Sequence, residues 1–219
     1  MEPWRVPQRA PRTVDELLEL LYSGRGVHSA SDHGGTTADL HEHALRTAAL
    51  LRRSRPSDKE LQVAGLLQDI ELLLHPGGAA HADLADAAAD ALHTLLGGRV
   101  ARLVRLHVHA ERYLAAVEPN RPLSPSSARR VAQRGGAMSA PEADAFVRDP
   151  LAEDAVALRQ AAEAAQVVEL DAGVLEDWRP VLELIAAGHA LPPPGVLHPA
   201  HPGAPSRRAV PPSHHPVHH

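Results

Sequence analysis

The sequence predicts an all-α protein, and two observations lead to this prediction. Alanine and aliphatic residues dominate the apolar positions, while the 219 residues include only two Trp, two Tyr and one Phe. This composition favours helices, because Leu and Ala have high helix propensity and strands are enriched in aromatic and β-branched residues. Ser, Thr and Gly also stand where helices usually begin and end. At this length we expect one domain with one core.

The first half of the chain divides into helices at recognisable start and stop signals. Thr13 with Glu16, and Ser57 with Glu60, match the capping-box pattern that opens a helix. We expect the helix that begins at Ser57 to continue through Gln68 and Asp69 to the "HPGG" segment. The other helices are predicted at 13–24, 37–53, 81–96 and 99–117.

The second half is predicted to hold four more helices. Ser124 is the expected N-cap of the first, with Pro125 at its first position, and the Gly135–Gly136 pair ends it. Ser139 and Glu142 repeat the capping box. The last two helices are expected within 150–168 and 174–188, and Pro180 could kink the second.

The two ends of the chain differ from the domain that we predict at residues 13–188. Residues 1–12 are predicted to be a disordered lead-in. Residues 189–219 are rich in proline and histidine and have no apolar periodicity. Such a segment cannot bury enough apolar surface to offset its chain entropy, so we predict a disordered tail.

Composition and charge exclude several classes of function. The net charge is −5 with neutral histidines, and Lys59 is the only lysine, so we expect neither nucleic acid nor an anionic membrane as a partner. The absence of cysteine excludes disulfides, thiolate metal sites and a cysteine nucleophile. The N-terminal stretch lacks the apolar core of a signal peptide, and no apolar run is long enough to span a membrane, so we expect a soluble, cytoplasmic protein.

Four polar residues stand on otherwise apolar helices. They are His43, Asp69, His107 and Asp154. A buried carboxylate is costly unless it is paired or bound to a metal. Two imidazoles and two carboxylates from four helices are typical ingredients of a metal site in a helical bundle. Each residue alone could equally be a core histidine bonded to a carbonyl or a carboxylate near a helix end.

Five segments carry a resemblance to a known family. They are "EHALRTAALL", "AGLLQDIELLL", "VRLHVHAERYLAAVEP", "LSPSSARRVAQRGGAMSAPEADAF" and "DPLAEDAVALR". Their order and spacing resemble the HD-domain superfamily, and within it the mixed-valent diiron oxygenases of organophosphonate degradation. The resemblance implies an HD-domain helical bundle, an iron centre and a small anionic organophosphorus substrate.

The resemblance also implies roles for the four polar residues. His43 matches a ligand of the first iron, and Asp69 matches the carboxylate that bridges the two irons. His107 matches a ligand of the second iron, and Asp154 matches the last ligand of the first.

Several positions depart from the family pattern. Gln68 stands where the family has the histidine of the His–Asp pair, and Leu84 replaces another ligand histidine. An amide oxygen is a much weaker iron ligand than imidazole, so we expect a degenerate site that holds one divalent metal, iron, rather than two, or that holds none. His81 lies one turn before Leu84, and Glu111 lies one turn after His107, so either could supply a replacement donor. The alternative for Glu111, which we favour, is a solvated helix residue paired with a neighbouring arginine.

The substrate-binding positions are changed as well. Ser124 and Ser127 are retained, whereas Arg130 and Arg134 replace a serine and a glutamine of the family. Glu111 replaces a lysine that resembles a phosphonate-binding residue, which reverses a charge. The two arginines lie one turn apart and could bind an oxyanion, or they could form an exposed basic stripe.

Three functions remain open from the sequence. The first is an HD-domain metalloprotein related to phosphonate-degrading oxygenases, with reduced or altered activity. The second is a non-catalytic binding or regulatory protein. The third is a mononuclear metal-dependent phosphohydrolase in which Asp69 and Asp154 orient a metal-bound water.

Overall fold

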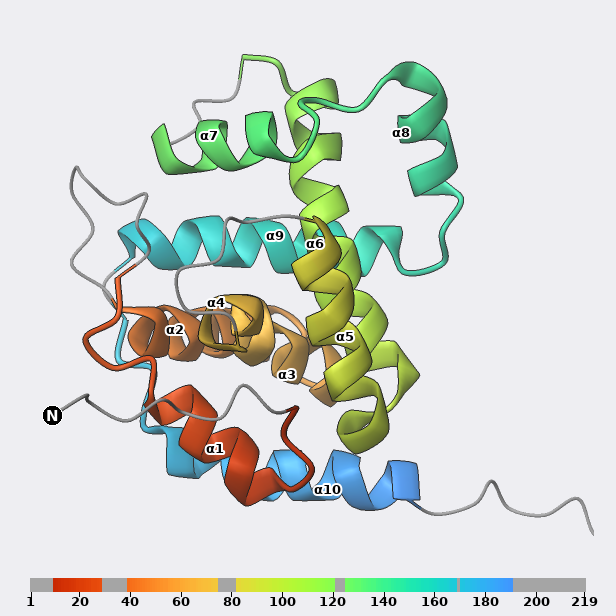
Figure 1. The fold of residues 1–219 in the computed structure, drawn as a ribbon. Helices are drawn as coiled ribbons and strands as arrows, with labels where there is room; N and C mark the ends of the chain where they lie inside the picture. The colour runs from red at the N-terminus through yellow and green to blue at the C-terminus, as the bar shows by residue number, and fades with distance from the viewer. Residues whose placement is uncertain (1–9, 29–38, 75–81, 121–124, 169, 191–219) are drawn as a thin grey trace, which may run out of the picture.

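A computed structural model describes residues 10–28, 39–74, 82–120, 125–168 and 170–190 (Figure 1). Over these ranges the chain consists of helices and the turns between them, which confirms the all-α prediction. The helices are α1 (Val14–Tyr22), α2 (Leu40–Ser54), α3 (Lys59–Leu67), α4 (Ile70–Leu74), α5 (Ala82–Leu96), α6 (Gly98–Val117), α7 (Pro125–Gln133), α8 (Ala140–Val147), α9 (Ala152–Val167), the 3₁₀ turn η1 (Leu175–Trp178) and α10 (Arg179–Ala190).

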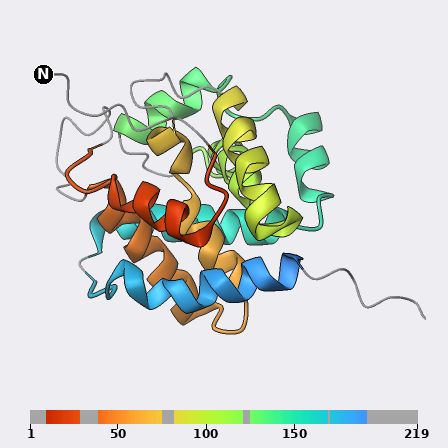
Figure 2. The same ribbon diagram turned by 60° about the horizontal axis from the view of Figure 1, so that its bottom comes forward.

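The long helix α6 organises the bundle. It packs against α3, α5 and α9, while α2 packs between α3 and α9. Helices α1 and α10 contact each other and close one end of the bundle, where Figure 2 shows α10 crossing the near face. Helices α7 and α8 lie on either side of α6 near its C-terminal end (Figure 1).

Two clusters of buried apolar side chains form the core. The larger one joins most helices and includes Leu17, Trp178 and Val104 of α6. The smaller one lies between α6, α8 and α9 and includes Ala110 of α6 and Phe146. His107 lies on α6 between Val104 of the larger cluster and Ala110 of the smaller one, and Glu111 follows Ala110. The candidate site is built around this part of α6.

Side chains cap the helices largely as the sequence predicts. The Thr13 hydroxyl accepts a hydrogen bond from the backbone N–H of Glu16 at 3.1 Å. The prediction of Ser57 as the cap of α3 is wrong by one residue. Asp58 is the N-cap, and its carboxylate accepts from the backbone N–H of Leu61 at 3.0 Å. Aspartate caps a helix as well as serine does, and at this position its carboxylate also reaches Arg99.

The prediction of one helix through Gln68 and Asp69 is also wrong. Helix α3 ends at Leu67, and α4 begins at Ile70. The backbone N–H of Leu72 donates to the carbonyl of Asp69 at 3.0 Å, which is the tighter three-residue spacing of a turn. This break places Asp69 at a junction between two helices, next to the buried side chain of Gln68.

The C-terminal helix starts differently from the prediction. Pro180 does not kink it, because the chain winds as a 3₁₀ turn up to Trp178 and Pro180 then lies in the first turn of α10. A proline is tolerated there because the first N–H groups of a helix have no partner within it. Helix α10 runs to Ala190, two residues beyond the predicted domain end. Residues 1–9 of the predicted lead-in and residues 191–219 of the predicted tail lie outside the described residues.

No helix within the described ranges combines the length and apolar character that crossing a membrane requires.

Candidate metal and anion site

His43 and Asp69, which the sequence predicts as metal ligands, lie side by side. His43 comes from α2 and Asp69 from the junction of α3 and α4, and His43 Nε2 lies 3.5 Å from Asp69 Oδ2. Burial would raise the pKa of Asp69, but the positive charges of His43 and Arg130 outweigh burial and lower it. Asp69 is therefore an anion, as a metal ligand must be.

Gln68 binds directly to this pair. Its Nε2 atom lies 2.9 Å from His43 Nε2 and donates to the Thr47 hydroxyl at 3.3 Å. The side chain is buried, and its Oε1 atom has no hydrogen-bond partner among the described residues. The amide thus engages the imidazole nitrogen of His43 that faces Asp69. It competes with any metal for that nitrogen.

His107 of α6 has the protonation state of a metal ligand. Its Nδ1 atom lies 2.6 Å from the carbonyl of Val104 and donates to it, which leaves Nε2 with a lone pair. Burial lowers the pKa of His107 to about 4, so the ring is neutral at neutral pH. Together with a carbonyl that fixes the ring orientation, this is the arrangement found around metal-bound histidines.

Glu71 completes a cluster of three ligand side chains. Ligand atoms of Asp69, Glu71 and His107 all lie within 4.8 Å of one another. Burial, with the negative charge of Asp69, raises the pKa of Glu71 to about 7, and its Oε2 atom has no hydrogen-bond partner among the described residues. A divalent cation would coordinate the unpaired Oε2 atom of Glu71 and balance the negative charges of Asp69 and Glu71. The residues present therefore fit a divalent metal ion.

Sequence reasoning missed Glu71. It lies three residues after Gln68, so a helix would place both on one face, and its neighbours Ile70, Leu73 and Leu74 are apolar. A charged residue within such a run was the signal that could have identified it.

Glu111 has a different role from the predicted ones. It is 1% exposed, so it is not a solvated helix residue. Its carboxylate forms ion pairs with Arg130 at 3.3 Å, Arg134 at 3.3 Å and Arg159 at 3.2 Å. Burial would raise the pKa of Glu111, but the three arginines outweigh burial and lower it. The carboxylate is thus committed to guanidinium groups, and the cluster of three metal-ligand side chains does not include it.

The predicted basic pair therefore faces inward and is not an exposed stripe. Arg130 and Arg134 extend from the α7 end of the site, and Arg159 reaches it from α9. The Ser127 hydroxyl accepts from Arg130 at 3.2 Å and from Arg159 at 3.3 Å. Arg159 was not foreseen, although its position on an Ala- and Leu-rich helix was a usable signal. Ser124 and His81 lie outside the described residues.

Asp154 does not join the other three predicted ligands. Its Oδ2 atom lies 2.8 Å from Arg99 Nη2, and Arg99 also pairs with Asp58 at 2.7 Å and with Glu60 at 3.3 Å. Helical geometry explains the difference. Asp154 and Arg159 are five residues apart on α9 and so point about 140° apart around the helix axis. Because Arg159 faces the site, Asp154 faces away from it.

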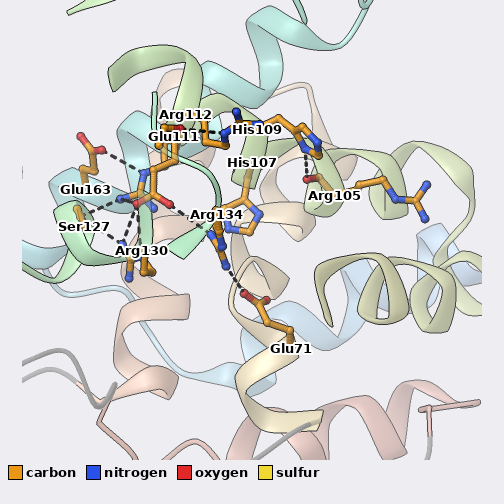
Figure 3. A network of polar contacts seen from close by, with 12 residues as sticks. Glu71, Arg105, His107, His109, Glu111, Arg112, Ser127, Arg130, Arg134 and Glu163 are labelled. Atoms are coloured by element: carbon orange, nitrogen blue, oxygen red, sulfur yellow. Dashed lines mark hydrogen bonds and ion pairs between the residues drawn. The ribbon is translucent and has the colours of Figure 1, made fainter. Parts of the chain in front are cut away.

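Arg134 links the two halves of the site. One of its terminal nitrogens lies 3.3 Å from Glu111, and the other lies 3.3 Å from Glu71 (Figure 3). The arrangement can thus hold a divalent cation at Asp69, Glu71 and His107, and an oxyanion among the arginines.

The comparisons with known proteins agree with this chemistry. No known family profile matches the chain. The chain is 30% identical over 181 residues to the hydroxymethylphosphonate dioxygenase of Gimesia maris, a match that covers 78% of this chain and 89% of the relative. It is 27% identical over 185 residues to the [1-hydroxy-2-(trimethylamino)ethyl]phosphonate dioxygenase (glycine-betaine-forming) of Leisingera caerulea, covering 80% and 92% respectively. The chain belongs to the family of phosphonate dioxygenases that these two relatives represent.

Proposed function

We propose that this chain is an HD-domain metalloprotein that binds one divalent metal, iron, and acts on a small anionic organophosphorus compound with reduced or altered activity. The observation that carries the proposal is the cluster of ligand atoms from Asp69, Glu71 and His107 within 4.8 Å. The names of the two relatives supply the substrate class.

The donor set supports one metal rather than two. Gln68 stands where the family resemblance implies a histidine, and its amide engages His43 at 2.9 Å. The only group of three or more metal-ligand side chains among the described residues is the one around Asp69. A bound iron would supply the redox chemistry that dioxygen reactions require.

The chain's own residues have separate tasks in this proposal. Asp69 and Glu71 provide negative charge for the metal, and the carbonyl of Val104 orients His107. Arg134 lies between these ligands and the anion-binding half, where Arg130 and Arg159 supply further positive charge. Bidentate guanidinium groups are well suited to a phosphonate oxyanion.

A second candidate, a non-catalytic binding protein, is favoured by Gln68 alone, because the amide competes for His43. The phosphohydrolase interpretation loses its support, since it requires Asp154 beside Asp69 and the structure pairs Asp154 with Arg99.

Metal content tests the proposal. The full chain is produced in iron-supplemented cells and analysed by plasma mass spectrometry, beside Asp69→Asn, His107→Ala and Asp154→Asn variants. We expect about one iron per chain in the parent and in Asp154→Asn, and strongly reduced iron in the other two. Two irons per chain would contradict the single-metal proposal, and no metal in the parent would leave only the binding protein.

Activity is measured on the same samples. Oxygen consumption is followed with hydroxymethylphosphonate, the compound named for one relative. Consumption that depends on iron and is lost in His107→Ala supports the proposed activity, while an iron-loaded parent that consumes no oxygen with it or other phosphonates favours the second candidate.

A further inference from the structure

Three guanidinium groups, two of them almost fully buried, converge on a single carboxylate. Arg130, Arg134 and Arg159 all lie within 3.3 Å of Glu111, and the side chains of Arg134 and Arg159 are 3% and 4% exposed. Arg134 also pairs with Glu71 at 3.3 Å and Arg159 with Glu163 at 3.1 Å, so the three guanidinium groups have three carboxylates, and Glu111 is the one that all three contact. Desolvating so many charged groups is costly, which makes their shared contact with Glu111 the feature to explain.

The geometry around Glu111 is that of a bound oxyanion. Oε1 faces Arg130 and Arg159, and Oε2 faces Arg134, so donors approach the carboxylate from separate helices. The Ser127 hydroxyl accepts from Arg130 (Figure 3). It also accepts from Arg159. Phosphate and phosphonate groups are recognised by the same combination of forked guanidinium groups and hydroxyls.

One donor in this group has no acceptor. The Nε atom of Arg134 is buried and has no hydrogen-bond partner among the described residues. A carboxylate has two oxygens, whereas a phosphate or phosphonate group offers three or four, so a larger oxyanion could satisfy this donor as well. An unsatisfied buried donor is costly and rare in folded proteins.

We propose that Glu111 fills, from within the chain, the oxyanion position that Ser127, Arg130, Arg134 and Arg159 surround. The carboxylate of Glu111 occupies the place of a ligand, and a phosphate or phosphonate binds only when that carboxylate leaves. The proposal deepens the proposed function, since it identifies the part of the site that receives the anionic group, and it rests on that function for its biological meaning alone.

Removal of the carboxylate tests this directly. Glu111→Ala is made in the full chain, and inorganic phosphate is titrated by calorimetry and in thermal melts, with sodium chloride holding the ionic strength constant. We expect the variant to bind phosphate at least about tenfold more tightly than the parent does, and its melting temperature to rise with phosphate concentration. Methylphosphonate is titrated in parallel, and tighter binding of it than of phosphate identifies the phosphonate group as the preferred oxyanion.

Two variants control for non-specific effects. Glu142 pairs with Arg112 at 3.0 Å on the surface, so Glu142→Ala also removes a carboxylate from an arginine but opens no buried site. It should bind phosphate no better than the parent. Adding Arg159→Met to Glu111→Ala should abolish the gain, because the third guanidinium is then missing.

Several results would overturn the inference. A folded Glu111→Ala variant that binds phosphate no better than the parent would do so, because the arginines would then serve the fold alone. Parent and Glu111→Ala proteins that bind phosphate equally tightly, with Arg159→Met weakening both, would equally contradict it, since Glu111 would not be excluding the ligand. If the alanine variant does not fold, Glu111→Gln removes the charge while keeping the bulk, and the same comparison with the parent applies.

Metal content, recorded in each sample, separates this inference from the proposed function. A Glu111→Ala protein that keeps its metal and fails to bind phosphate contradicts the oxyanion site alone. A Glu111→Ala protein that gains phosphate binding but never binds metal contradicts the proposed metalloprotein alone.

Discussion

The amide nitrogen of Gln68 lies 2.9 Å from Nε2 of His43, the same nitrogen that faces Asp69 Oδ2 at 3.5 Å. A histidine is thus present where a metal ligand is expected, yet its inward-facing nitrogen is already engaged. The first prediction follows from this contact.

Gln68→His should increase metal binding. The variant replaces an amide that competes for His43 with an imidazole that is itself a donor, next to Asp69. We expect the affinity for ferrous iron to rise by about tenfold, which is the scale on which changes beside metal ligands act. Anaerobic titration measures it, and Gln68→Leu, which removes the amide without adding a donor, is the matched control. Equal affinities in Gln68→His and Gln68→Leu would show that only the competition mattered.

Glu111→Lys should severely destabilise the fold. The sequence suggests this substitution as a return to the family pattern, but the structure shows that the new ammonium group would face Arg130, Arg134 and Arg159 in a buried place. Breaking a buried ion pair typically costs about 3–5 kcal/mol. Urea unfolding measures the loss, and Glu142→Lys at the exposed pair with Arg112 should be much milder. Comparable losses in the two variants would contradict the burial argument.

The pH dependence of stability should reveal Glu71 in metal-free protein. Because its folded pKa of about 7 lies above the ordinary 4.5, its contribution to stability is complete below about pH 4.5 and is lost as the pH rises to 7. Glu71→Gln has no carboxyl group to ionise at this position, so it does not lose this stability as the pH rises. The variant should therefore gain on the parent between pH 5 and 7.5, by at most about 3 kcal/mol.

Titration of His107 changes the stability in the opposite direction, but it does so equally in the parent and in Glu71→Gln and therefore cancels in their difference. Its folded pKa of about 4 means that stability falls as the pH drops from 6.5 towards 4, in parent and variant alike. Added ferrous or manganous ion should favour the parent at pH 7.5, because the ionised Glu71 binds it. A parent–variant difference that does not change with pH would show that Glu71 does not titrate in this range.

Asp58→Ala should weaken helix α3, whereas Ser57→Ala should not. Asp58 both caps α3 and binds Arg99 through two nitrogens at 2.7 Å. Loss of an N-cap alone costs about 1 kcal/mol, so we expect at least that much in thermal or urea unfolding. A larger loss of stability in Ser57→Ala than in Asp58→Ala would show that Ser57 is the N-cap, as the sequence pattern predicts.

Much of the fold could be predicted from local sequence signals. Thr13 and the Gly97–Gly98 pair mark helix ends through backbone chemistry that acts within a few residues, and the structure places helix boundaries beside them. The cap at Ser57 was displaced because Asp58 gains a partner, Arg99, that lies 41 residues away. No local pattern reports such a contact.

The site could be predicted only in part for the same reason. His43, Asp69 and His107 were identified as polar residues on apolar helices, and the structure brings Asp69 close to each histidine. Asp154 was identified in the same way and matched to the family pattern, but which face of α9 meets the site depends on Arg159 and its partner Glu111. Glu71 escaped attention because it belongs to the short helix beyond an unforeseen break.

The double contact of Arg134 means that the two halves of the site cannot be loaded independently. A cation that neutralises Glu71 removes one attraction on this guanidinium and leaves it freer to hold an anion on the other side. By thermodynamic reciprocity, an anion that draws Arg134 away from Glu71 must strengthen cation binding by the same factor. The shared side chain thus makes occupancy by opposite charges mutually reinforcing.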